Sequence, residues 1–112
     1  MFLRLYDGHS INMDDIRCII PVSKGNYSKS DRLFIDEIKN DKRLGFIMNW
    51  TKGKAQKSAI VTSGTQNKLI IYITSMSPDL IQNRIDEYQN VKRKYQGADF
   101  SKTEIDKDLK KG

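Results

Sequence analysis

The sequence predicts an α+β fold, in which a largely antiparallel sheet carries one inserted helix and one C-terminal helix. Several short segments have the β-branched and aromatic composition of strands, and turn-forming pairs such as Asp7-Gly8 separate them. Longer segments have instead the apolar spacing and capping residues of helices. A chain of 112 residues suits a single domain, which we place at residues 1–97, with a charged C-terminal tail at 98–112.

The expected strands share short apolar or alternating runs that are bounded by turn formers. They are residues 1–6, 10–12, 16–22, 46–50, 57–63 and 68–75. Pro21 places the third run at an edge of the sheet, because proline cannot donate to a strand ladder. Cys18 lies in the same run, and we expect a small buried hydrophobe there. As the only cysteine, it has no partner for an intramolecular disulfide.

The inserted helix is expected over residues 31–43. Ser28 or Ser30 can cap its first turn, and Gly45 is expected to stop it. Its buried stripe is expected to consist of Phe34, Ile35 and Ile38.

The C-terminal helix is expected to begin at Ser77-Pro78, because serine caps a helix and proline suits its first turn. It should run to about Gln96, with Gly97 as its stop. Its apolar stripe comprises Ile81, Ile85, Tyr88, Val91 and Tyr95. Such a stripe packs either into the core or against a helix of another subunit. The tail that follows is either a frayed helix or disordered.

The segment 69–73, with sequence LIIYI, is apolar on both faces of the strand that it predicts. An exposed antiparallel strand alternates apolar and polar residues, so this strand needs cover on both sides. Either the two helices of one chain enclose the sheet, or a second subunit covers one face.

The composition favours binding over catalysis. A formal net charge of +6 and a pI near 9.5 favour polyanionic partners, nucleic acid first. The chain has no phosphate-binding or dinucleotide-binding glycine motif, no Cys/His cluster for zinc, and a single histidine, His9. We therefore expect no enzyme, no cofactor, no metal and no small-molecule substrate. The chain also shows no signal peptide or membrane span, so a cytoplasmic location without membrane partners is expected.

Residues 49–63, NWTKGKAQKSAIVTS, concentrate lysines between two expected strands. Lys52, Lys54 and Lys57 are consistent with a solvated hairpin end, where charge discourages edge pairing. They are equally the residues that neutralise phosphates on a fixed turn, where Gly53 permits close backbone approach. Trp50 and Tyr27 offer a third interpretation, the stacking of unpaired bases of RNA or single-stranded DNA.

Three strings carry a resemblance to a known family: SINMDDIRCII, DRLFIDEIKNDKRLGFIMN and GKAQKSAIVTSGTQNKLIIYITSMSPDLIQNRI. In order and local pattern they resemble the RemA-like family of bacterial extracellular matrix regulators, over about residues 1–86. The resemblance implies a core like that of LytTR DNA-binding domains. It also implies homo-oligomeric rings whose basic surface residues contact the DNA backbone.

Transferred by position, the family's basic loop falls on Gly53, Lys54 and Lys57, with Lys52 preceding it. Ala55 and Asp15 stand where the family carries basic residues, and this weakens the transferred site. The cations that can compensate are Arg17, Lys24 and Arg84.

The expected function is that of a ring-forming, homo-oligomeric transcriptional regulator that binds double-stranded DNA, with biofilm or matrix genes as the implied targets. Its expected partners are duplex DNA and further copies of the chain. The alternative is a structural or protein-interaction module that keeps the fold and has lost DNA binding.

Overall fold

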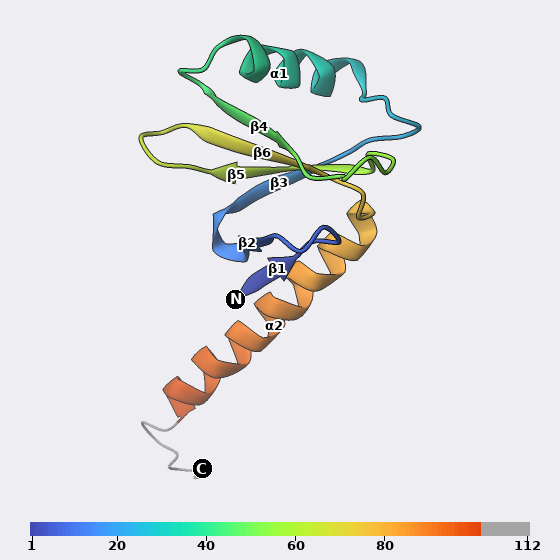
Figure 1. The fold of residues 1–112 in the computed structure, drawn as a ribbon. Coiled ribbons are helices and arrows are strands. Elements are labelled where there is room, and N and C mark those ends of the chain that lie inside the picture. The colour runs from blue at the N-terminus through green and yellow to red at the C-terminus, as the bar shows by residue number, and fades with distance from the viewer. Residues whose placement is uncertain (102–112) are drawn as a thin grey trace. The chain divides into compact units, whose positions relative to one another are not determined.

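The structure, a computed structural model, describes the backbone of residues 1–101 and the side chains of residues 1–94. It divides into two compact units, Met1–Gln82 and a second that begins at Asn83. The first unit holds all the strands and the inserted helix (Figure 1). The chain belongs to the α+β class, as the sequence predicts.

Each predicted strand and both predicted helices are present, with small shifts at their ends. The elements are β1 Phe2–Arg4, β2 Ser10–Asn12, a 3-10 turn Met13–Asp15, β3 Ile16–Pro21, α1 Lys29–Asn40, β4 Gly45–Asn49, β5 Ser58–Ser63, β6 Leu69–Thr74 and α2 Pro78–Ser101. β1 and β2 form a hairpin, and the other four strands form one sheet in the order β3-β5-β6-β4.

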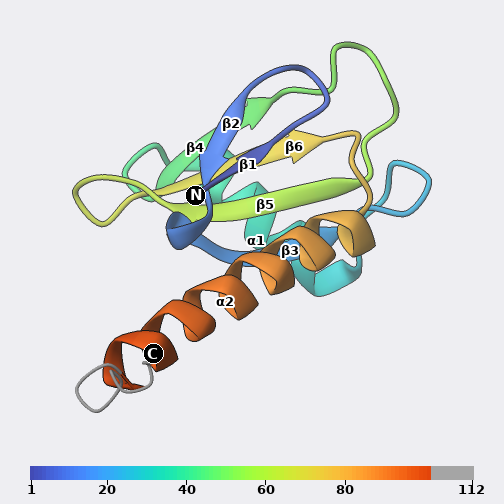
Figure 2. The same ribbon diagram turned by 90° about the horizontal axis from the view of Figure 1, so that it is seen from below.

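The position of β4 was not predicted. β3, β5 and β6 pair antiparallel, but β4 runs parallel to β6, with Gly45 opposite Leu69 and Asn49 opposite Ile73. Because β6 lies between β4 and β5, residues 50–57 are not a hairpin turn but a connection that crosses the end of β6 (Figure 2). The interpretation of this segment as a hairpin end is therefore wrong.

α1 begins at Lys29, two residues earlier than predicted, and ends at Asn40, three residues sooner than predicted. The side chain of Ser28 accepts a hydrogen bond from the Asp31 amide at 3.3 Å, so Ser28 and not Ser30 is the cap. The helix ends at Asn40, because Asp41 has extended backbone angles. Gly45 does not stop it but opens β4, where a Cβ atom would collide with the carbonyl of Leu69 across the parallel pair.

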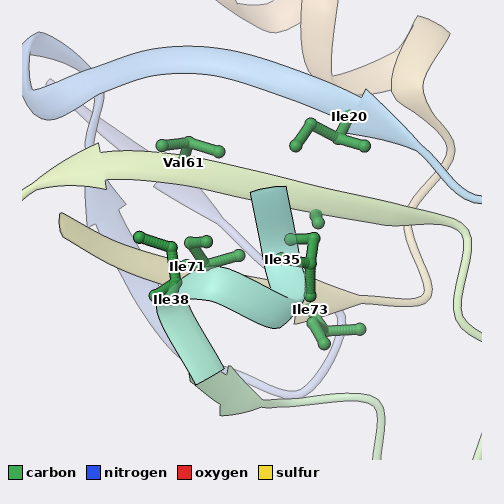
Figure 3. Packing of buried hydrophobic residues seen from close by; sticks show 7 residues of the cluster. Ile20, Ile35, Ile38, Val61, Ile71 and Ile73 are labelled. Atoms are coloured by element: carbon green, nitrogen blue, oxygen red, sulfur yellow. The ribbon is translucent and has the colours of Figure 1, made fainter. Parts of the chain in front are cut away.

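One face of the sheet packs against α1 through aliphatic side chains (Figure 3). Ile35 and Ile38 of α1 are buried as predicted, whereas Phe34 is only partly buried at the edge of this cluster. The buried cluster consists of Ile20, Ile35, Ile38, Ala59, Val61, Ile71 and Ile73.

The opposite face is covered by the β1–β2 hairpin, which lies on the other side of the sheet from α1 (Figure 1). Leu3 of β1 and Ile60 of β5 are fully buried. Three hydroxyl-bearing residues on this face are buried as well, namely Ser58, Thr62 and Thr74. Within the first unit, the doubly apolar strand β6 has α1 on one face, where Ile71 and Ile73 are buried, and the β1–β2 hairpin on the other, where Ile70 and Tyr72 are half-buried.

Cys18 is exposed, which contradicts the expectation of a buried hydrophobe. It lies on edge strand β3, beside a register shift in the pairing with β5. Partial burial and the nearby charge of Asp31 raise the pKa of its thiol.

α2 begins as predicted, with Ser77 Oγ accepting from the Leu80 amide at 3.3 Å. It does not stop at Gly97 but continues to Ser101. Along its apolar stripe, Ile81 is fully buried in the first unit, whereas Val91 in the second unit is 44% exposed. The tail predictions for residues 102–112 lie outside the described residues. Among the helices of residues 1–101, none is long and apolar enough to cross a membrane.

Candidate nucleic-acid interface

The lysine-bearing connection 50–57 is held at both ends by hydrogen bonds. At its start, Asn49 Oδ1 accepts from the amide and the hydroxyl of Thr51, at 3.1 and 2.8 Å. At its end, the Lys57 amide donates to Thr74 O, and Lys57 O accepts from the Val22 amide, both at 2.9 Å. The backbone that carries the lysines is therefore fixed to three neighbouring segments.

Between these ends the chain turns tightly. Lys52 and Gly53 both have positive φ angles, 52° and 78°, and the Lys54 amide donates to Thr51 O at 3.1 Å. A positive φ suits glycine, while at Lys52 it is an unusual conformation. An added Cβ at Gly53 would meet nothing within 4 Å, so the conformation of the turn and not a lack of space accounts for glycine there.

Trp50 fixes the connection to the rest of the unit by aromatic stacking. Its ring lies 3.9 Å from the ring of His9 on one side and 4.4 Å from that of Tyr72 on the other, at interplanar angles of 6° and 27°. Both ring faces are therefore occupied by the protein's own side chains. Tyr27 is partly buried against the α1 cluster. Trp50 therefore offers no free ring face to a stacked base, and this argues against the single-strand interpretation at Trp50.

The Asp7–His9 pair, which was not among the predicted site residues, supports this stack. Asp7 accepts from the ring Nδ1 of His9 at 2.7 Å and from its amide at 3.0 Å. Burial by itself raises the pKa of the Asp7 carboxyl. The hydrogen bonds from the His9 side chain and backbone, with the charges of His9 and Lys52, outweigh burial and hold that pKa below its ordinary value. Lys52 is thus close enough to the hairpin to act on this carboxylate.

A second loop joins the lysine connection at the same end of the sheet. Residues 22–28 follow β3, and Lys24 and Gly25 line a hollow of about 620 Å³ together with Ala55, Gln56 and Lys57. Lys24 also has a positive φ angle, of 54°. The loop sequences VSKGNYS and WTKGKAQK contain no acidic residue. The exposed lysines of this end are Lys24, Lys52, Lys54 and Lys57. We call these two loops the basic end of the sheet.

Of the other predicted cations, Arg17 lies at the opposite end of the sheet from the basic end, and Arg84 belongs to the second unit. Arg17 lies at the start of β3, where its guanidinium donates to Ser63 Oγ at the far end of β5. At about 3.3 Å per residue, the length of β5 separates the two ends by roughly 17 Å. Arg84 is exposed on α2 in the second unit. Asp15, the acid at the family's basic position, is exposed in the turn before β3, also far from the lysines.

Lys24 was predicted only as a cation that can compensate, and His9 was given no place in this site. Lys24 stands in an acid-free loop with a glycine, as the other lysines do, but only the pairing of β3 with β5 brings the two loops together. His9 follows the Asp7-Gly8 turn, and its stacking on Trp50 depends on a contact between segments that are distant in sequence. Within the described part of the chain, no group of three or more His, Cys, Asp or Glu side chains is placed to hold a metal ion.

In comparisons with known proteins, no family model, no curated protein and no solved structure matches this chain. The RemA-like resemblance therefore stays a prediction.

Proposed function

We propose that this protein binds double-stranded DNA through the phosphate backbone, using the lysines of the basic end of the sheet. The observation that carries the proposal is the meeting of two acid-free loops, with Lys24 and Lys57 lining one hollow and Lys52 and Lys54 on the adjoining turn. Their backbone is hydrogen-bonded and stacked in place, so little backbone conformational entropy is lost when the ammonium groups meet phosphates.

The chemistry of these side chains sets the kind of recognition. A lysine ammonium contacts phosphate as a point charge and lacks the planar fork with which arginine reads guanine. Binding of this kind positions a protein on DNA and leaves specificity to the shape and deformability of the duplex. Arg17 and Arg84 are outside this interface in our proposal, because nothing in the first unit brings them to the lysines.

Assembly into a homo-oligomer is the second part of the proposal, and a ring, as in the family that the sequence resembles, is its preferred form. The apolar stripe of α2 supports it, since Val91 is 44% exposed and Ile85 and Tyr88 are only half-buried. Repeating the basic end in each subunit multiplies weak phosphate contacts through effective concentration. In this form the protein acts as a cytoplasmic transcriptional regulator without catalytic activity.

The test is duplex DNA binding over a series of salt concentrations, with the mass in solution measured on the same samples. Exchanging Lys54 and Lys57 for alanine should lower the affinity for all duplexes and reduce the magnitude of the log–log salt slope by about 2. The double variant Lys39→Ala, Lys42→Ala is the matched control, because it removes the same charge from exposed positions near α1. Equal effects of the two pairs would reject the site, and salt-independent binding would reject the phosphate mechanism.

The alternative of an oligomeric interaction module without DNA affinity is decided by the same samples. A protein that assembles and shows no salt-sensitive DNA binding would support that alternative.

A further inference from the structure

β4 is an edge strand whose outer side has unpaired backbone groups. It is the last strand of the sheet, and its two ends are bonded to β6: Leu44 O accepts from the Leu69 amide, and the Trp50 amide donates to Ile73 O. In a parallel ladder, alternate residues direct both their N–H and C=O groups to the same side. The residues of β4 that direct theirs away from β6 are therefore Gly45, Ile47 and Asn49.

A groove of about 580 Å³ follows this free edge, between β4 and α1. All five residues of β4 line the groove. Because their side chains point alternately toward α1 and away from it, the groove runs along the edge of the strand and not over one face. Its floor is largely apolar. The apolar lining residues include Tyr27, Ile35, Ile38, Ile47 and Ile73.

The rim of the groove is basic. Arg32 and Lys39 on α1 and Lys42 after it line the groove with one acid, Asp36. All four side chains are exposed. Among the residues that the structure describes, none of the three cations forms an ion pair within 4 Å. The rim therefore has an excess of positive charge that the first unit itself does not neutralise.

We propose that this edge binds an extended acidic segment of a partner protein as a fifth strand. The peptide backbone would pair with the free groups of Gly45, Ile47 and Asn49. Because successive side chains of a strand point to opposite faces, carboxylates on the α1 side would meet Arg32, Lys39 and Lys42, and apolar side chains on the other side would pack beside the exposed Phe46 and Met48. Main-chain pairing at a sheet edge, with pockets for alternate side chains, is a recurrent mode of peptide recognition. From Gly45 to Asn49 β4 spans about 13 Å, which matches a peptide segment of about five residues.

The rim charge selects this occupant over two others. A second copy that paired edge to edge through β4 would offer the segment GFIMN, which has no acid, and would bring its own basic rim toward this one. DNA would meet the cations but would leave the apolar floor and the free backbone groups without partners. Tyr27 and Gln56 of the basic-end loops also line the groove, but none of the lysines of the basic end does, so the proposal depends on different cations from the proposed DNA site.

The experiment uses the full-length protein labelled with ¹⁵N and three synthetic peptides. The first alternates glutamate and valine over seven residues, the second replaces every glutamate by lysine, and the third replaces the central valine of the acidic peptide by proline. We expect the acidic peptide alone to shift the amide signals of Gly45, Ile47 and Asn49 in a saturable manner. Proline removes a backbone donor, so the third peptide should bind at least about tenfold more weakly.

Variants then test the rim. Exchange of Arg32 and Lys39 for glutamate should abolish binding of the acidic peptide, while the control pair Lys52→Glu, Lys54→Glu at the basic end should leave it within about twofold. Saturable binding that reverses with rim charge supports the proposal. It is overturned if the acidic peptide does not bind, if the lysine peptide binds as well, or if the shifted signals lie elsewhere. A concentration-dependent dimer that shields the same three amides would assign the edge to a second copy and would equally overturn it.

Discussion

The two faces of the four-stranded sheet are stabilised by different interactions. The face toward α1 is a cluster of isoleucine, valine and alanine side chains with no hydrogen-bonding groups. On the face toward the β1–β2 hairpin, buried hydroxyls bond to backbone. Ser58 Oγ donates to Met76 O at 2.7 Å, and Thr62 Oγ1 donates to Ile70 O at 2.8 Å. The stack of His9, Trp50 and Tyr72 continues this second face into the lysine connection.

The difference separates two tasks within one small unit. Stability on the α1 face depends on volume, because a close-packed aliphatic cluster loses contacts when a methyl group is removed. On the hairpin face it depends on complete hydrogen bonding, because an unpaired buried polar group costs more than a made bond contributes. The aromatic stack on the hairpin face includes Trp50, so changes on that face reach the proposed DNA site.

The largest effect is expected from Ile71→Ala on the α1 face. Ile71 is fully buried in the cluster, and its truncation should lower the free energy of unfolding by about 4 kcal/mol. Urea denaturation measures the change. Leu33→Ala on the same unit is the control, because Leu33 is 64% exposed, and its effect should stay below about 0.5 kcal/mol. Similar losses for the two variants would mean that the cluster is not the close-packed core of the unit.

A smaller loss is expected from Ser58→Ala on the hairpin face. The change removes little volume but leaves the buried carbonyl of Met76 without the bond from Oγ, at a cost of about 2 kcal/mol. The reciprocal variant is Ala59→Ser, one residue along β5 and on the opposite face, where a hydroxyl meets only aliphatic neighbours. We expect thermal denaturation to show both variants destabilised. A neutral Ser58→Ala would contradict the hydrogen-bonded character assigned to this face.

The smallest effect is expected from Asp7→Asn, and it should depend on pH. Folding lowers the pKa of the Asp7 carboxyl. Its contribution to the free energy of unfolding is therefore fully present above the ordinary pKa of about 3.9, and it is lost as the pH falls through the lower pKa of the folded state. The variant should therefore be less stable than the natural protein near pH 7, by about 1 kcal/mol, and equally stable in strong acid.

The fluorescence emission of Trp50, the only tryptophan, should report the same change. Without the Asp7 carboxylate, the His9 ring is held less firmly on Trp50, and the indole becomes more exposed to water. Asp36→Asn, which makes the same change of charge at an exposed position, is the control. A pH-independent difference between the Asp7 variant and the natural protein would show that the carboxylate charge is not what holds His9.

Local signals predicted the elements well because their causes are local. Ser28 and Ser77 cap the helices that follow them, and Asp7-Gly8 turns the first hairpin. The spacing of Ile35 and Ile38 predicted the buried face of α1 correctly.

The errors concern contacts between distant segments. The insertion of β6 between β4 and β5 changes a predicted hairpin into a crossing, and it changes Gly45 from a helix stop into the residue that lets β4 approach β6. No periodicity within residues 45–58 specifies that pairing. The place of Arg17 at the far end of the sheet follows from the same topology. The lysines themselves were predicted from charge, but their meeting with Lys24 and the support from His9 were not.

The parallel pairing of β4 also sets an order of assembly. β5 and β6 are joined by the short loop 64–68, so their antiparallel pair closes at a small entropic cost. β4 can find its place only when β6 already offers an edge, because its partners lie far along the chain and α1 must close over the same cluster. β4 is accordingly expected to join after the β5–β6 pair and, as an edge strand, to separate before that pair does.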